Sequence, residues 1–234
     1  TVPPWERPPR ARSCPPVAAV PTVEQLQAAQ RGARDRGLLW RLKRDGEVSY
    51  LYGTLHLGKL EWAFPGPTVR SAMAASQSLA LELDLDDPAV AHAIAESGAR
   101  NPKALRLSGE MQRRLARQEE VACLPAGALD NQHPILRAVT LAMLTARWEG
   151  LDPSYAQERV LGSAARAGRI PVLSLESPRQ QLEALIPKEE AKAIELLLQT
   201  LIQIESGVAR RTTARLAQVW AAGRLAELER YEQW

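Results

Sequence analysis

The chain has 234 residues, of which 45% are hydrophobic and 24% charged, so it can bury a core and is not expected to be disordered as a whole. The formal net charge is only +3. Acidic and basic residues alternate instead of forming a basic stripe interleaved with aromatics, which disfavours nucleic-acid binding. No run of about 18 apolar residues occurs, so we expect no transmembrane segment.

A proline-rich arm is predicted over residues 1–21, ahead of one domain over residues 22–234. The chain starts at Thr1 instead of a methionine, which indicates that a targeting segment was removed or that the sequence was trimmed. Cys14 and Cys123 belong to no C-x-x-C pair, which excludes a zinc knuckle. An exported protein could tie the arm down with a disulfide through Cys14, and two free thiols are the alternative.

A β-hairpin is predicted over residues of about 38–56, after a helix at 22–31. Asp45-Gly46 is a two-residue turn of the kind that needs positive φ, and strand-like runs flank it. Pairing Arg44 with Glu47 sets the register. Period-two alternation then divides the side chains between two faces, one with Trp40, Leu42, Leu51 and Leu55 and the other with Tyr50, Tyr52, Thr54 and His56.

A short apolar strand is predicted over residues of about 78–84. Alternation puts its leucines on one face, and Glu82 and Asp84 on the other. If this strand is a neighbour of the hairpin, His56 and Glu82 converge. A histidine and a carboxylate at the ends of neighbouring strands are a usual beginning of a metal site.

The rest of the chain reads as helices around one more strand, at residues 170–175. Ser177 to Gln180 has the pattern of a capping box, and Asp152-Pro153 has the pattern of a helix start. One helix is expected to end at Ala75. Further helices are expected over residues 87–98, 108–120, 133–148, 152–168 and most of 177–234. This alternation predicts an α/β fold, with a small mixed sheet flanked by many helices.

Five groups of residues carry a resemblance to a known family. They are 39–42 with Tyr-Leu-Tyr-Gly-Thr-Leu-His at 50–56, Leu-Glu-Leu-Asp at 81–84, Gly-Leu-Asp at 150–152 with Tyr155, Val-Leu-Ser-Leu-Glu-Ser at 172–177 with Gln181, and Trp-Ala-Ala-Gly-Arg-Leu at 220–225. In this order they resemble the TraB/GumN family, which is related to the TIKI metalloproteases and, more distantly, to the erythromycin-esterase/ChaN-like fold. Arg224 stands where the family has an aspartate.

The resemblance implies a metal-dependent hydrolase, in particular a peptidase. Family members use a Gly-x-x-His motif from each half of the fold and a glutamate after an early strand. Gly53 and His56 match the first motif, and Glu82 matches the glutamate. The family's Arg-Asn segment and second Gly-x-x-His are not found in this sequence, so the resemblance implies an incomplete version of the fold.

His56 is therefore predicted to bind a divalent metal, and Glu82 to bind it or to act as a general base. Histidine suits Mn, Co, Fe or Zn, which leaves the metal open. The alternatives are a hydrogen-bonded strand-end histidine and a solvated carboxylate. Four further residues are candidates for supporting the site or contacting the substrate: Gly53, Thr54, Tyr52 and Glu176. For Glu176 the sequence agrees equally well with a residue that merely precedes the helix cap at Ser177 and has no role in the site.

Two functions remain open at this point. The first is an exported, periplasmic or secreted, hydrolase acting on a peptide or small molecule, with export resting on the arm, on Thr1 and on the habit of the family. The second is a non-catalytic protein of the same fold that binds haem, iron or a peptide through His56 and the tyrosines. Turnover that is lost in Glu82→Ala separates the first from the second.

Overall fold

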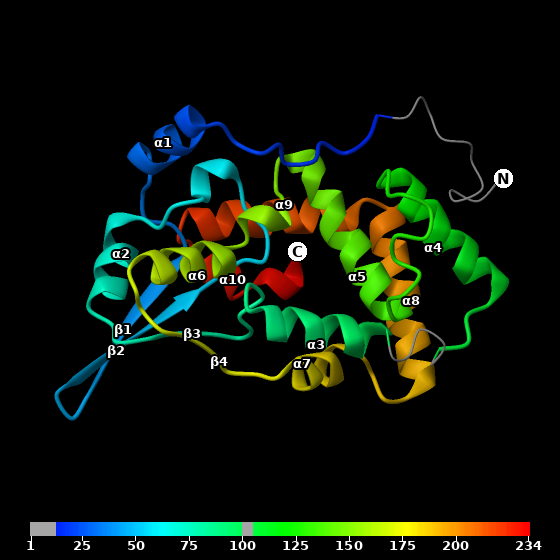
Figure 1. Ribbon diagram of the computed structural model, residues 1–234. Coiled ribbons are helices and arrows are strands. Elements are labelled where there is room, and N and C mark those ends of the chain that lie inside the picture. The colour runs from blue at the N-terminus through cyan, green and yellow to red at the C-terminus, as the bar shows by residue number, and fades with distance from the viewer. Residues whose placement is uncertain (1–12, 100–104) are drawn as a thin grey trace. The chain divides into compact units, whose positions relative to one another are not determined.

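The computed structural model describes residues 13–99 and 105–234, and Figure 1 shows their helices and strands. The described residues fall into two compact units. Of the described residues, unit 1 contains 13–17, 88–99, 105–149 and 176–211, and unit 2 contains Ala18–Asp87, Gly150–Leu175 and Thr212–Trp234. The α/β class is confirmed. The first twelve residues of the predicted arm lie outside the described part, and the arm and the domain from residue 22 remain predictions.

Unit 1 is helical. Its elements are α3 (Pro88–Ala99), α4 (Gly109–Val121), α5 (Pro134–Leu144), the 3-10 helix η3 (Thr145–Glu149), α7 (Pro178–Leu185), α8 (Glu190–Glu205) and the start of α9 (Val208–Ala221). Ser177 and Gln180 form the predicted capping box of α7. The helix expected at 133–148 ends as an α-helix at Leu144 and continues as η3.

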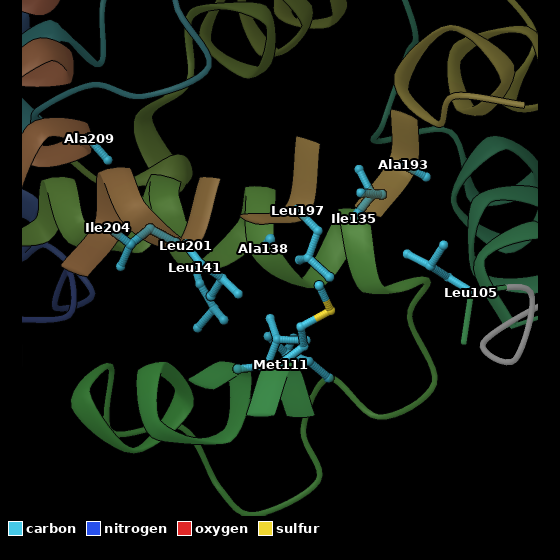
Figure 2. Packing of buried hydrophobic residues seen from close by; sticks show 12 residues of the cluster. Leu105, Met111, Ile135, Ala138, Leu141, Ala193, Leu197, Leu201, Ile204 and Ala209 are labelled. Atoms are coloured by element: carbon cyan, nitrogen blue, oxygen red, sulfur yellow. The ribbon is translucent and has the colours of Figure 1, made fainter. Parts of the chain in front are cut away.

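The core of unit 1 lies between α5 and α8, with α4 against them. Ile135 and Leu141 of α5 and Leu197 and Leu201 of α8 are at most 2% exposed, and Figure 2 shows them in one cluster with Met111 of α4. Helical spacing predicts an apolar stripe through Ile194, Leu197, Leu201 and Ile202, and the first three lie in this cluster or pack against it. Ile202, at its margin, is 48% exposed. Cys14 and Cys123 of this unit form a disulfide, so the free-thiol alternative is wrong.

Unit 2 contains all four strands of the described residues. Its elements are α1 (Val23–Arg31), β1 (Leu38–Arg44), β2 (Glu47–Gly53), η2 (Leu60–Trp62), α2 (Pro67–Ala74), β3 (Leu79–Leu81), η4 (Pro153–Tyr155), α6 (Gln157–Ala167), β4 (Val172–Ser174), the rest of α9, α10 (Leu225–Leu228) and η5 (Tyr231–Gln233). No helix within the described ranges is long and apolar enough to span a membrane.

The hairpin has the predicted register. Arg44 pairs with Glu47, Trp40 with Leu51 and Leu42 with Ser49. The prediction of one sheet is wrong, because β1 and β2 form one two-stranded sheet and β3 and β4 form a separate parallel pair. Three-residue strands offer too few ladder bonds and too little apolar surface to recruit the hairpin.

Two predicted strands are longer than the observed ones, and this affects the site. β2 ends at Gly53, so Thr54 and His56 lie in irregular chain and their face does not follow from alternation. β3 ends at Leu81, so Glu82 lies in the bend that follows. The strand expected at 170–175 is β4, Val172–Ser174, which is three residues long and has Leu173 53% exposed.

Trp220 of α9 holds the base of the hairpin. Its indole Nε1 donates to the carbonyl of Gly53 at 2.7 Å, and its own carbonyl accepts from the Gly37 amide at 3.0 Å. Its ring packs against Trp62 and Tyr52, with centroids 5.6 and 6.3 Å away. Helix α9 thereby fixes the strand end from which the segment with His56 departs.

Candidate functional site

The segment after β2 is held against residues 152–157 by backbone hydrogen bonds. The Gln157 amide donates to the Leu55 carbonyl at 2.8 Å. Gly58 and Asp152 form an isolated antiparallel bridge, with N–O distances of 3.1 and 2.8 Å. His56 lies between these two anchor points, which place it beside the start of α6.

Gly58 makes this close approach possible. A Cβ at Gly58 would lie 2.1 Å from the Tyr155 carbonyl oxygen, a distance that no side chain tolerates. At Gly53 the nearest atoms to a Cβ would be 3.9 Å away, which is ordinary contact. The close backbone approach in this segment therefore occurs at Gly58 and not at the motif residue Gly53.

His56 is paired with a glutamate that the sequence analysis did not select. The Nδ1 atom of His56 lies 3.1 Å from Oε1 of Glu158, in the first turn of α6. The Thr54 hydroxyl donates to the same oxygen. The His56 side chain is 64% exposed and that of Glu158 is 11% exposed, so a buried carboxylate holds a solvent-accessible imidazole.

Glu158 is ionised at neutral pH. Burial by itself raises its pKa, but the hydrogen bonds from His56 and Thr54 and the charge of His56 bring the pKa below the usual value. The second oxygen, Oε2, is buried and finds no hydrogen-bond partner among the described residues. A buried carboxylate oxygen without a donor is costly, and such atoms concentrate at functional sites.

The His56 imidazolium is stabilised by this environment. Its hydrogen bond to Glu158 raises the pKa of His56, burial opposes the rise in part, and the negative charges of Glu158 and Glu82 add to it. Glu82 is exposed and acts on His56 only through its charge. The charge of Glu82 thus acts on His56, as the sequence predicted for two residues that lie near each other. The side chain that contacts His56 directly is Glu158.

Replacing Glu158 by glutamine should lower the pKa of His56 toward about 6.5, because the amide removes both the charge and the strongest acceptor. Since the pKa of His56 is raised in the folded protein, its contribution to stability is complete below pH ~6.5 and is lost as pH rises through the folded pKa. Glu158→Gln should remove this pH dependence.

A histidine NMR titration of the wild type and of Glu158→Gln checks the expectation. His92, an exposed residue of α3 paired only weakly with Glu96, provides the internal control. An unchanged His56 titration in the variant would show that the two side chains do not interact in solution.

The other predicted residues have mixed placements. Tyr52 donates its hydroxyl to the Arg36 carbonyl at 2.7 Å, and burial raises its pKa to about 12. Its ring packs on Trp220, so it supports the hairpin. Glu176 is exposed and belongs to unit 1, which leaves its predicted role a prediction. Asp84 is held by Arg166, with an Nη2–Oδ2 distance of 2.6 Å.

Glu158 could have been found from periodicity. It lies three residues before Leu161 and seven before Ala165, and all three are buried on one side of α6. A glutamate on the apolar face of a helix is rare unless it has a partner. This signal marks Glu158 as a paired residue without identifying His56 as its partner.

The fold and this pair define an α/β protein in which a buried glutamate holds an exposed histidine by one ring nitrogen. The chain belongs to the TraB/PrgY/gumN family, whose model matches residues 38–233. The resemblance found in the sequence is therefore confirmed. No curated protein and no solved structure gives a significant match.

Proposed function

We propose that this protein is an exported, metal-dependent hydrolase of the TraB/GumN type that cleaves peptides, with His56 as a metal ligand. The observation that carries the proposal is the contact between His56 Nδ1 and the Glu158 carboxylate. An ionised carboxylate can only accept, so in the neutral imidazole the proton is on Nδ1 and the lone pair is on Nε2. Histidines that bind metals almost always donate their other N–H in this way.

The residues fit a metal site in part. His56 supplies a nitrogen donor, and Glu82, whose charge acts on His56, supplies a carboxylate. Within residues 13–99 and 105–234, no three His, Cys, Asp or Glu side chains gather in a way that could hold a metal ion. The proposal therefore gives His56 and Glu82 as two donors and assigns the remaining positions to water, substrate or groups outside this set.

Each residue has a separate task under this proposal. A bound divalent ion of the Mn, Co, Fe or Zn kind would supply a water of lowered pKa. Glu158 and Thr54 fix the ring of His56 and direct Nε2 away from the carboxylate. Glu82, which is exposed, would bind the ion or accept the proton of the water.

Export is supported by the disulfide. Cys14 and Cys123 are joined, and structural disulfides form and persist in oxidising compartments such as the periplasm or the extracellular space. The same bond argues against a reducing environment during folding. Peptides of such a compartment are the substrates to test first.

Calorimetric titration with Mn²⁺, Co²⁺ and Zn²⁺ tests the proposal. We expect one-to-one binding that weakens beyond detection in His56→Ala and about tenfold to a hundredfold in Glu158→Gln, the usual cost of losing the carboxylate behind a ligand histidine. His92→Ala, which removes an exposed histidine of unit 1, is the matched control and should bind like the wild type.

Peptide hydrolysis in the presence of the metal that binds is the second measurement. Loss of turnover in Glu82→Gln with the fold intact supports the hydrolase. Metal binding that is equal in His56→Ala and His92→Ala would overturn the assignment of His56. Binding of haem or peptide that survives Glu82→Gln, with no turnover by any variant, would favour the non-catalytic alternative.

A further inference from the structure

The β1–β2 hairpin exposes one apolar face. Trp40, Leu42 and Leu51 share this face through the pairs Trp40–Leu51 and Leu42–Ser49, and they are 40%, 51% and 60% exposed. In Figure 1 the tip of the hairpin extends away from the helices of unit 2. Large apolar side chains that gather on an exposed face mark interaction surfaces in folded proteins.

The opposite face of β1 carries two cations that have no acidic residue directly across from them on β2. Arg41 lies across from Tyr50, and Lys43 lies across from Val48, so neither has an opposite charge on the neighbouring strand. Both side chains are exposed. The charged pair of the hairpin is Arg44 with Glu47 at the turn, where Arg44 also approaches Asp45 at 3.6 Å.

The outer edge of β1 is open for pairing. Among the described strands, β1 pairs with β2 alone, and its residues from Trp40 to Arg44 are exposed. In an antiparallel pair every second residue directs its N–H and C=O away from the partner. Unpaired groups of this kind are a template for another strand.

We propose that the open edge of β1 binds an extended acidic peptide segment of a partner protein as an added antiparallel strand. Main-chain hydrogen bonds to the edge require a polypeptide backbone as the ligand. Side chains alternate between the two faces of β1, and this alternation determines which residue types the peptide needs at successive positions. Aliphatic residues lie beside Trp40 and Leu42, and Glu or Asp residues alternate with them beside Arg41 and Lys43.

Charge complementarity selects this occupant over a second copy of the chain. Two β1 edges from two copies would bring Arg41 and Lys43 close to the same cations of the other molecule, and like charges on adjacent strands are destabilising. An acidic strand satisfies both cations. The proposal is independent of metal binding by His56, because it uses no residue of that site.

Cations on an edge strand also have a protective use, since lysine and arginine discourage aggregation. Protection and recognition make opposite predictions for an acidic strand. A purely protective edge binds no peptide, whereas a recognition edge binds acidic peptides and rejects basic ones.

Fluorescence anisotropy with labelled peptides tests the proposal on the full chain. The probe alternates glutamate with valine over eight residues, and the matched peptide replaces each glutamate by lysine. We expect the acidic peptide to bind, the basic peptide not to bind, and Lys43→Glu to weaken the acidic peptide about tenfold, as expected for reversing one exposed charge. Binding should also weaken as salt rises.

Lys188→Glu is the control variant, because it reverses an exposed lysine of unit 1 outside the hairpin. Leu42→Ser tests the apolar face and should also weaken binding. Equal affinity in Lys43→Glu and Lys188→Glu, or no binding of the acidic peptide, overturns the proposal. A dimer in sedimentation equilibrium that is lost in Leu51→Lys, without peptide binding, would assign the face to a second copy and overturn it as well.

Discussion

Replacing both Cys14 and Cys123 by serine is expected to lower the free energy of unfolding by about 4–5 kcal/mol. The disulfide joins residues 109 positions apart, so the covalent ring contains the hairpin and β3 as well as α3 and α4. In the chain-entropy model, closing a loop of about 100 residues removes enough freedom from the unfolded chain to stabilise the fold by ~4.7 kcal/mol. A loss of this size is a large part of the stability of an ordinary domain.

Urea denaturation of the oxidised wild type and of the double serine variant measures the effect. Reduction of the wild type should reproduce the midpoint of the variant, and the reductant should leave the variant unchanged. A midpoint shift equivalent to less than about 1 kcal/mol would mean that the unfolded chain is already compact enough to lose little by opening the ring.

Local chemistry predicted the parts of the fold that depend on neighbours in sequence. Asp45 and Gly46 occupy positive φ at 50° and 86°, as the turn type requires, and the register of the hairpin follows from that turn. The stripe through Leu197 and Leu201 follows from helical spacing. In each case the information lies within about one turn of helix or one hairpin, where sequence patterns are most direct.

Contacts between distant segments could not be predicted in this way. Thr54 and Glu158 are 104 residues apart and meet because the chain at Gly58 touches the chain at Asp152. No periodicity carries that pairing. The choice of His56 and Glu82 as metal ligands stays a prediction, and the sequence did not identify Glu158 as the contact of His56.

The alternating pattern of the hairpin also could not predict that its apolar face is exposed. Alternation correctly put Trp40, Leu42 and Leu51 on one face, but it does not say whether that face is covered. In the structure, the Trp220 indole binds the carbonyl of Gly53 at the base of the hairpin, and the tip of the hairpin extends away from the helices of unit 2 (Figure 1). A pattern gives the side of a strand on which residues lie, but not what covers that side.

Removing Arg114 is the second change for which a large loss of stability is expected. Arg114 of α4 makes two hydrogen bonds to Glu205 of α8, at 2.8 and 2.7 Å, and the side chains are only 6% and 9% exposed. The bond to Glu205 raises the pKa of Arg114. Arg114→Ala leaves a buried carboxylate without its partner, which typically costs about 3–5 kcal/mol.

The double variant Arg114→Met with Glu205→Leu separates the stability that the ion pair provides from the cost of leaving one buried charge unpaired. With both charges gone, no desolvated ion remains, and apolar side chains of similar volume beside the core of Leu115 and Leu201 should restore most of the stability. Lys192→Ala is the matched control, because its pair with Glu189 is about two-thirds exposed on both sides and should be worth less than about 1 kcal/mol.

Thermal or urea unfolding of the four proteins decides between two accounts of the α4–α8 contact. If the double variant is as unstable as Arg114→Ala, the ion pair itself holds the two helices together. If it recovers, the helices are held by the apolar cluster around Leu201, and the charges chiefly fix which turn of α8 lies against α4, since a bidentate arginine–carboxylate bond tolerates only one register.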